Sequence, residues 1–153
     1  MEIISGMIEA HIFRDINDDM EFLLLKRSDR VIYPGLWQMV NGKIKNGEKA
    51  YQTALREIKE ETGLIPERLW VVPNVNAFYS HENDNIMMLP VFTAKVNEPS
   101  KVIISDEHCD FRWVNPNKAK EMLAWEGQRK SVDLIVNYFK KEINYLNLVE
   151  ISF

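Results

Sequence analysis

Runs of apolar residues separated by short polar breaks predict the first strands of the chain. Residues 3–13 are rich in Ile, Met and Phe, and residues 21–26 contain the continuous run Phe22-Leu23-Leu24-Leu25. Such a run is typical of a strand that is buried on both faces. Residues 15–19 are short and polar, and side chains of this kind bond their own backbone, so a turn is expected between the two strands.

Further apolar blocks predict strands later in the chain. Residues 28–36 contain the turn pair Pro34-Gly35 and predict a surface loop that leads to a short strand over residues 37–42. Polar residues 80–85 separate two apolar blocks, and this pattern predicts a hairpin with strands at residues 69–79 and 86–96. A last short strand is expected over residues 110–114.

Apolar residues at helical spacing predict helices in three places. One begins near Asn46, a candidate N-cap, with Glu48 in its first turn, and ends before Gly63. Its apolar stripe consists of Ala50, Ala54, Leu55 and Ile58. Asn115 is expected to cap a second helix that runs to about residue 123, and residues 131–146 predict an amphipathic third helix. This order of strands and helices suits an α/β fold with a mixed sheet between helices.

Composition indicates one globular domain over residues 1–153. The 153 residues are 46% hydrophobic and 27% charged, which suffices for one buried core. The net charge of -4 gives no electrostatic footprint for nucleic acid. The single cysteine, Cys109, fits a reducing cytoplasm, and the N-terminal residues predict neither a signal peptide nor a membrane anchor.

Three carboxylates are crowded on the first predicted helix. Glu57, Glu60 and Glu61 stand at positions i, i+3 and i+4, so they share one face, where like charges repel. A divalent cation would remove this conflict, because Mg²⁺ and Mn²⁺ prefer oxygen ligands. A glutamate-rich outer face is the alternative, and the flanking residues decide between the two.

These flanks match the Nudix box at every fixed position, and the chain therefore resembles a Nudix hydrolase. The matching positions are Gly42, Glu48, Arg56, Glu57, Ile58, Glu60, Glu61, Gly63 and Leu64. The resemblance implies an α/β/α sandwich and an Mg²⁺ site, with Mn²⁺ as a substitute. It also implies that Glu57, Glu60 and Glu61 ligate the metal with the Gly42 carbonyl, while Arg56 orients Glu48 or Glu57.

Residues outside the box resemble the branch that acts on dihydroneopterin triphosphate and deoxynucleoside triphosphates. The segments Leu36-Trp37-Gln38, Val40-Asn41-Gly42 and Asp106-Glu107-His108 carry this resemblance. It implies that Glu107 completes the metal site or acts as general base. Trp125 and Arg129 resemble a substrate-facing segment of the same branch, although Trp125 could equally be a packing residue.

Other candidates for substrate binding are cations and aromatic residues. Arg27 and Lys43 are either ligands of the substrate phosphates or ordinary surface cations. Trp37 enters the box, and Tyr79 either stacks on a ring of the substrate or packs at the rim of the sheet.

The resulting hypothesis is an Mg²⁺-dependent pyrophosphohydrolase that converts a nucleotide or pterin triphosphate to its monophosphate and pyrophosphate. The alternatives are hydrolysis of an oxidised nucleotide, ADP-ribose or a dinucleoside polyphosphate, and a non-catalytic nucleotide-binding regulator. Partners expected are small molecules, with neither nucleic acid nor membrane. The apolar segment 146–153 is either an added strand or part of an interface, which leaves a homodimer open.

Overall fold

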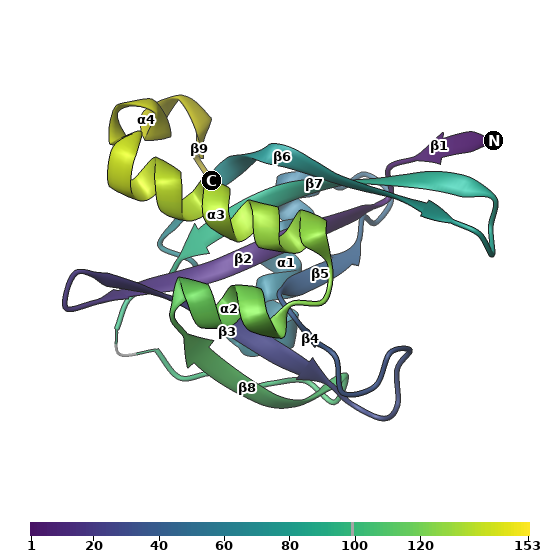
Figure 1. Ribbon diagram of the computed structural model, residues 1–153, viewed down its shortest axis with the longest axis horizontal. Coiled ribbons are helices and arrows are strands. Elements are labelled where there is room, and N and C mark those ends of the chain that lie inside the picture. Colours follow the sequence, from purple (N-terminus) through teal and green to yellow (C-terminus); the bar gives the residue numbers. More distant parts are fainter. Residues whose placement is uncertain (99) are drawn as a thin grey trace.

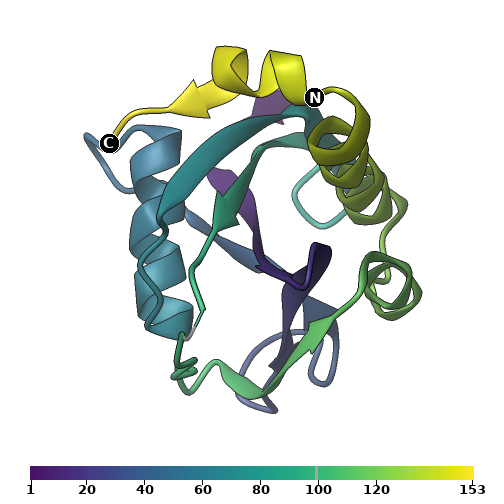
Figure 2. The ribbon, with the colours of Figure 1, turned by 90° about the vertical axis from the view of Figure 1, so that its left-hand side faces the viewer.

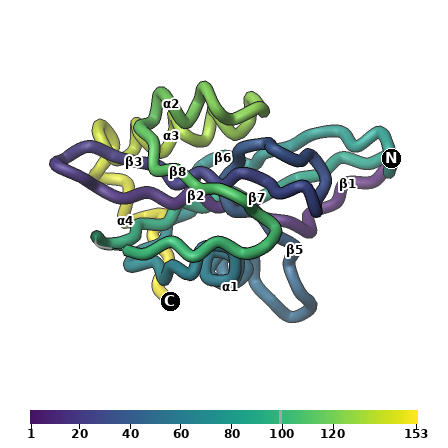
Figure 3. The backbone as a smooth tube through the Cα atoms, turned by 90° about the horizontal axis from the view of Figure 1, so that it is seen from below, coloured from purple at the N-terminus to yellow at the C-terminus, as the bar shows by residue number. Residues whose placement is uncertain are grey.

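A mixed β-sheet lies between helices on its two faces in the computed structural model, which describes residues 1–98 and 100–153 (Figure 1). Helix α1 (Ala50–Thr62) covers one face. Helices α2 (Pro116–Met122) and α3 (Glu126–Lys141) cover the other, as the view from below shows (Figure 3). The α/β sandwich predicted from the sequence is therefore confirmed.

The centre of the sheet is formed by strands β2 (Met7–Ile16) and β3 (Asp19–Arg27), which pair antiparallel. The turn between them holds Asn17 and Asp18 at positive φ, and these residue types tolerate that conformation well. Phe22 to Leu25 are all buried, at most 2% exposed, as the apolar run predicted. Strand β8 (His108–Val114) pairs with β3 along its other edge.

The predicted hairpin is confirmed as β6 (Arg68–Ser80) and β7 (Asn85–Lys95). Strand β7 also pairs parallel with β2, and this pairing makes the sheet mixed. The short strand β1 (Glu2–Ile4) pairs parallel with the start of β7, so the N-terminus lies beside the hairpin tip (Figure 1). At the other end of β6, strand β9 (Glu150–Ile151) pairs with Leu69 and Trp70, so the C-terminal segment adds a strand to its own sheet.

Two of the predicted strands are divided. Residues 3–13 form β1 and β2, with a break at Ser5 and Gly6, and residues 37–42 form β4 (Trp37–Gln38) and β5 (Val40–Lys43). The second division arises because β4 pairs with β3 whereas β5 pairs with β2. Met39, which lies between them, is fully buried. An apolar pattern does not show such a change of partner.

Helix α1 begins later than the sequence predicted. Its N-cap is Lys49, not Asn46, and Glu48 lies before the helix instead of in its first turn. The backbone of Lys49 donates to the side chain of Gln52, and the Glu48 carboxylate accepts from the backbone of Lys45. The predicted core stripe is confirmed, because Ala54 and Ile58 are fully buried against β2 and β3.

The helices of the other face also differ from the prediction at their ends. Asn115 caps α2 as expected, because its side chain accepts from the backbone N–H of Lys118. The predicted helix 131–146 instead begins at Glu126 and ends at Lys141, and a 3₁₀ turn (Ile143–Tyr145) and the short α4 (Leu146–Val149) follow it. Figure 2 shows α2 and α3 along one side of the sheet and α1 along the opposite side.

Aromatic rings fix α3 on the sheet. Phe139 of α3 lies edge-on against Phe13 and Trp70, with ring centroids 4.8 and 4.9 Å away. No helix in the described part of the chain is long and apolar enough to cross a membrane.

Candidate active site

Strand β5 and helix α1 are in close contact at Gly42 and Glu57. A Cβ atom added to Gly42 would overlap the side chain of Glu57, so only glycine leaves room for this carboxylate above the strand. The register of β5 on β2, with Gly42 opposite Ile8, fixes the position of the strand. Gly42 therefore forms the floor beneath Glu57.

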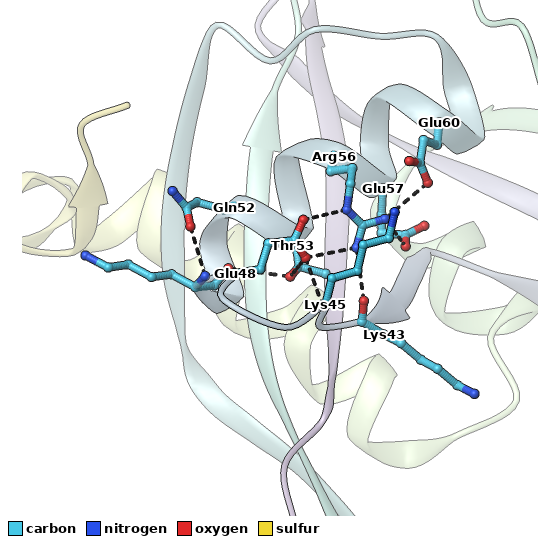
Figure 4. A network of polar contacts seen from close by, with 9 residues as sticks. Lys43, Lys45, Glu48, Gln52, Thr53, Arg56, Glu57 and Glu60 are labelled. Carbon is cyan, nitrogen blue, oxygen red and sulfur yellow. Dashed lines mark hydrogen bonds and ion pairs between the residues drawn. The ribbon is translucent and has the colours of Figure 1, made fainter.

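Arg56 joins helix α1 to the loop before it (Figure 4). Its Nε and Nη2 donate to the two oxygens of Glu48 at 2.6 and 3.0 Å, and Nη2 also donates to the Lys43 carbonyl at 3.0 Å. Its Nη1 donates to Glu57 at 2.7 Å and to Glu60 at 3.2 Å. The guanidinium thus contacts both carboxylates that the sequence offered as its partner, Glu48 and Glu57.

Glu48 is held as a carboxylate by these contacts. Hydrogen bonds from Arg56, and then from Thr53 at 2.7 Å, lower the pKa of Glu48 to about 2. A group with such a low pKa stays ionised at any physiological pH. It therefore anchors Arg56, which in turn orients Glu57.

The C-terminal half of α1 faces a cavity of about 150 Å³ whose lining is almost entirely acidic. The lining residues are Glu57, Glu60, Glu61, Ser105, Asp106 and Glu107. The structure thus brings Glu107 to the three helix glutamates, as the resemblance implied. Asp106, which stands next to Glu107 in the sequence, also lines the cavity.

The segment that carries Glu107 is fastened to the end of α1 by main-chain hydrogen bonds. The N–H of Ile103 donates to Thr62 O at 2.8 Å, and that of Ser105 donates to Glu61 O at 3.3 Å. On its other side, the N–H of Ser28 donates to Glu107 O at 2.9 Å. These bonds hold the fourth glutamate opposite the helix.

Glu61 is the most buried of the four glutamates, at 3% exposed. Its Oε2 has no hydrogen-bond partner among the described residues. Burial, followed by the negative charges of Glu57 and Glu107, raises the pKa of Glu61 to about 9, although Arg27 acts in the opposite direction. Burial likewise raises the pKa of Glu57, against the effect of Arg56.

His108 lies on the far side of Glu61. Its Nε2 is 3.7 Å from Glu61 Oε1 and 3.2 Å from Gln38 Nε2, and both His108 and Gln38 are buried. Burial, with a smaller effect of Arg27, lowers the pKa of His108 to about 4, so the ring is neutral at pH 7. Gln38 and His108 entered the sequence analysis only as parts of the family resemblance, and their contact was not predicted because it depends on strand register.

The donor set of the cavity fits a divalent cation. Carboxylate oxygens are the ligands that Mg²⁺ and Mn²⁺ prefer, and an orphaned buried carboxylate oxygen such as Glu61 Oε2 is otherwise unfavourable. Within residues 1–98 and 100–153, no three acidic, His or Cys side chains already form a metal cage. Glu57 and Glu60 are both paired with Nη1 of Arg56.

The two candidate phosphate ligands, Arg27 and Lys43, differ in their contacts with the rest of the protein. Arg27 is close enough to Glu61 to affect its pKa, but its guanidinium also donates to the Ile32 carbonyl at 2.5 Å and to Gln38. The side chain of Lys43 points away from the network of Arg56 (Figure 4). Neither residue lines the cavity.

The other predicted substrate-binding residues also lie outside the cavity lining. Trp37 packs beneath the guanidinium of Arg112, and Tyr79 donates to Asp84 near the hairpin turn. Trp125 is half exposed at the N-cap of α3, edge-on to Tyr33. Arg129 donates to the carbonyls of residues 123 and 124 and to the Glu126 carboxylate.

Comparison with known proteins agrees with this site. The profile of the NUDIX domain matches residues 8–135. An asymmetrical bis(5'-nucleosyl)-tetraphosphatase of Caenorhabditis elegans is 31% identical over 103 residues, 67% of this chain and 72% of that protein. A nucleoside triphosphatase NudI of Escherichia fergusonii is 28% identical over 127 residues, 78% of this chain and 90% of that protein.

One further relative is much longer. An octanoyltransferase of Myxococcus xanthus is 34% identical over 105 residues, which are 64% of this chain, and the chain spans only 28% of that protein. Solved structures share the fold. An Ap4A hydrolase of C. elegans superposes with a TM-score of 0.74 at 23% identity, over 89% of this chain and 97% of that one. The dihydroneopterin triphosphate pyrophosphohydrolase of E. coli gives 0.70 at 21% identity, over 85% and 93%.

The chain belongs to the Nudix family. The family profile covers most of its length, and three glutamates of the box line one acidic cavity. It is accordingly a Nudix hydrolase, an enzyme, as the sequence predicted.

Proposed function

We propose that the chain is an Mg²⁺-dependent pyrophosphohydrolase of a nucleotide-like triphosphate, such as dihydroneopterin triphosphate or dATP. Water and the triphosphate give the monophosphate and pyrophosphate. The observation that carries this proposal is the cavity formed by Glu57, Glu60, Glu61 and Glu107, in which Glu61 is buried without a hydrogen bond to Oε2. The relative named as a nucleoside triphosphatase supports the substrate class.

The roles of the residues follow from their positions. Glu57, Glu60 and Glu61 would hold Mg²⁺ with the Gly42 carbonyl, and the ion would neutralise the triphosphate and lower the pKa of a water molecule. Arg56 would orient Glu57 through its hydrogen bond, and Glu60 would give up its contact with Arg56 in order to bind the cation. Glu107 lines the same cavity, and it would either complete the metal site or act as the general base.

The remaining candidates would bind the substrate away from the metal. Arg27 and Lys43 would contact phosphate oxygens, and Trp125 offers an exposed ring at the start of α3. Arg129 would position Trp125 by holding the preceding carbonyls. Trp37 and Tyr79 would contribute at the edges of the substrate site.

The second candidate function is hydrolysis of a dinucleoside polyphosphate. It is favoured by the similarity to the tetraphosphatase of C. elegans. The same carboxylates and the same cation would serve, because the box acts on the phosphate chain and other residues select the rest of the substrate.

The test is product release from a panel of substrates with Mg²⁺ and with chelator. The panel contains dihydroneopterin triphosphate, the common nucleoside and deoxynucleoside triphosphates, ADP-ribose and a dinucleoside tetraphosphate. Selective pyrophosphate release from dihydroneopterin triphosphate or a deoxynucleotide supports the proposal. Turnover of the dinucleotide or ADP-ribose alone replaces the substrate class, and tight nucleotide binding without turnover supports a regulator.

A further inference from the structure

Behind Glu61, three side chains from neighbouring strands form a chain of polar contacts. Arg27 of β3 donates through Nη1 to Gln38 Oε1 of β4 at 3.2 Å, and Gln38 Nε2 lies 3.2 Å from His108 Nε2 of β8. The strands bring them together, because β3 pairs with β4 through Leu25 and Gln38 and with β8 through Arg27 and His108. The chain of contacts ends at Glu61, 3.7 Å from His108.

The amide of Gln38 can be oriented in only one way. A guanidinium has donors and no acceptor, so the atom of Gln38 that faces Arg27 must be the oxygen. Asn41 Nδ2 donates to the same oxygen at 3.2 Å. The amide NH₂ of Gln38 therefore points at His108.

This orientation selects the tautomer of His108. Since Gln38 Nε2 donates, His108 Nε2 must accept, and the proton of the neutral ring is then on Nδ1. His108 Nδ1 has no hydrogen-bond partner among the described residues, so none of them competes with Gln38 for this choice.

The tautomer matters for Glu61. An N–H at His108 Nε2 could donate to Glu61 Oε1, would occupy one of its lone pairs and would draw the carboxylate toward β8. A lone pair at Nε2 cannot do so, and 3.7 Å is beyond hydrogen-bond range. The ring then packs against Glu61 and leaves both carboxylate oxygens without a donor on this side.

We propose that Gln38 and His108 are positioning residues for Glu61. Arg27 and Asn41 fix Gln38, Gln38 keeps His108 from donating, and His108 holds the Glu61 carboxylate at the cavity with its oxygens available to a divalent cation. This inference rests on the proposed function, in which Glu61 is a ligand of Mg²⁺.

The first experiment reads the tautomer directly in metal-free protein. ¹⁵N NMR of the imidazole rings needs the assignment of only three histidines, of which His108 is identified by its loss in His108→Gln. The wild type is expected to carry the proton on Nδ1, and Gln38→Met to move it to Nε2. Lys130→Met, at an exposed position on α3, is the control and should change nothing. A proton on Nε2 in the wild type, or an unchanged tautomer in Gln38→Met, overturns the inference.

The second experiment measures Mg²⁺ binding by calorimetry without substrate. Gln38→Met is expected to weaken binding about 10-fold or more, as is usual when a residue that orients a metal ligand is lost. Lys130→Met should bind as the wild type does, and circular dichroism confirms that both variants fold. Equal binding by wild type and Gln38→Met overturns this inference alone. A wild type that binds no Mg²⁺ overturns the proposed function and this inference with it.

Discussion

Glu61 is a side chain that the fold tolerates at a cost. It is 3% exposed, lacks a partner for Oε2 and faces the charges of Glu57 and Glu107, and these features raise its pKa to about 9. In the metal-free protein, folding therefore disfavours the ionised form of Glu61 that an unfolded chain adopts above pH 4.5. Glu61 therefore lowers the stability of the metal-free protein, and it is also a residue that the proposed reaction requires.

Replacing Glu61 with Gln should separate the two effects. Glu61→Gln keeps the shape and removes the charge, so we expect turnover to be abolished. The free energy of unfolding in chelator should rise by about 2 kcal/mol at pH 8, because Gln does not ionise and so removes the cost that the raised pKa of Glu61 imposes on folding above pH 4.5. Product release and urea unfolding measure the two. Glu67→Gln, at an exposed position beyond the helix, should change neither. A destabilised Glu61→Gln would contradict the assignment.

A second buried carboxyl lies on the opposite face of the sheet. Glu9 of β2 is 2% exposed, accepts from Asn76 at 2.6 Å and has a buried Oε2 without a partner among the described residues. Burial raises its pKa, and the side chains of Asn76 and Gln128 act in the opposite direction. The native state therefore keeps the proton of Glu9 to a higher pH than the unfolded chain does.

This shift predicts a pH dependence of stability. Above the unfolded pKa of 4.5 the unfolded chain loses the proton while native Glu9 retains it, so stability falls as pH rises toward the raised native pKa. Glu9→Gln should remove this contribution. We expect equal stability of the two proteins near pH 4 and a higher free energy of unfolding for Glu9→Gln at pH 8. Urea unfolding across pH tests this, with the exposed Glu82→Gln as control.

At the scale of elements, helix α1 is held by contacts at its middle and at its C-terminal end. Arg56 ties its middle to Glu48 before the helix, and Gly63 ends it in a left-handed conformation at φ 72°. The N–H of Gly63 donates to Lys59 O at 2.9 Å. These contacts hold the glutamates of the last turns in place relative to the segment that carries Glu107.

The left-handed end of α1 predicts the effect of a single methyl group. Gly63→Ala should lower the free energy of unfolding by about 1 kcal/mol, because a Cβ disfavours positive φ. The added Cβ would also lie 3.4 Å from the Ile103 side chain. Thermal unfolding measures the loss. Gly6→Ala, where an added Cβ meets nothing within 4 Å, is the control, and equal losses in both variants would contradict the argument.

The sequence predicted elements better than their pairing. Apolar runs predicted β3 and the hairpin of β6 and β7 correctly, because apolar residue types indicate directly which positions are buried. The N-cap of α1 was missed, since Asn46 and Lys49 compete for the role and side-chain contacts of Glu48 and Gln52 decide between them. The division at Met39 was missed because it depends on two different partner strands.

In the candidate site too, local features were predicted better than contacts between distant segments. Helical spacing alone placed Glu57, Glu60 and Glu61 on one face, whereas Glu107 was associated with them only through the family resemblance. The contact of Gln38 with His108 had no signal in the sequence, because three strands must pair in register to create it. Local geometry is readable from spacing, and contacts between strands are not.

At the scale of the whole molecule, one sheet supports both halves of the core. Ile8, Ala10 and Ile12 of β2 pack under α1, while Phe13 of the same strand packs under α3. Neither face can lose its helices without exposing residues of the shared strands. The described chain should therefore behave as one cooperative unit.

This cooperativity is measurable with two probes. Residues 1–153 should unfold in one transition, with the same denaturant midpoint by far-ultraviolet circular dichroism and by tryptophan fluorescence. Trp70 and Trp113 report on different faces of the sheet, so Trp70→Phe and Trp113→Phe test whether each face gives the same midpoint. Two separated transitions would show more than one folding unit.

The main-chain fastening of residues 103–107 has a consequence for how this enzyme can diversify. The bonds from Ile103 and Ser105 to the end of α1, and from Ser28 to Glu107, join main-chain atoms. Substitutions at the exposed positions of this segment should therefore leave the Glu107 backbone in place. Changes of length are absorbed upstream, in the loop after β7, because lengthening a loop costs little free energy. We therefore expect residues that bind a different substrate to be inserted in that loop, while the acidic cavity stays unchanged.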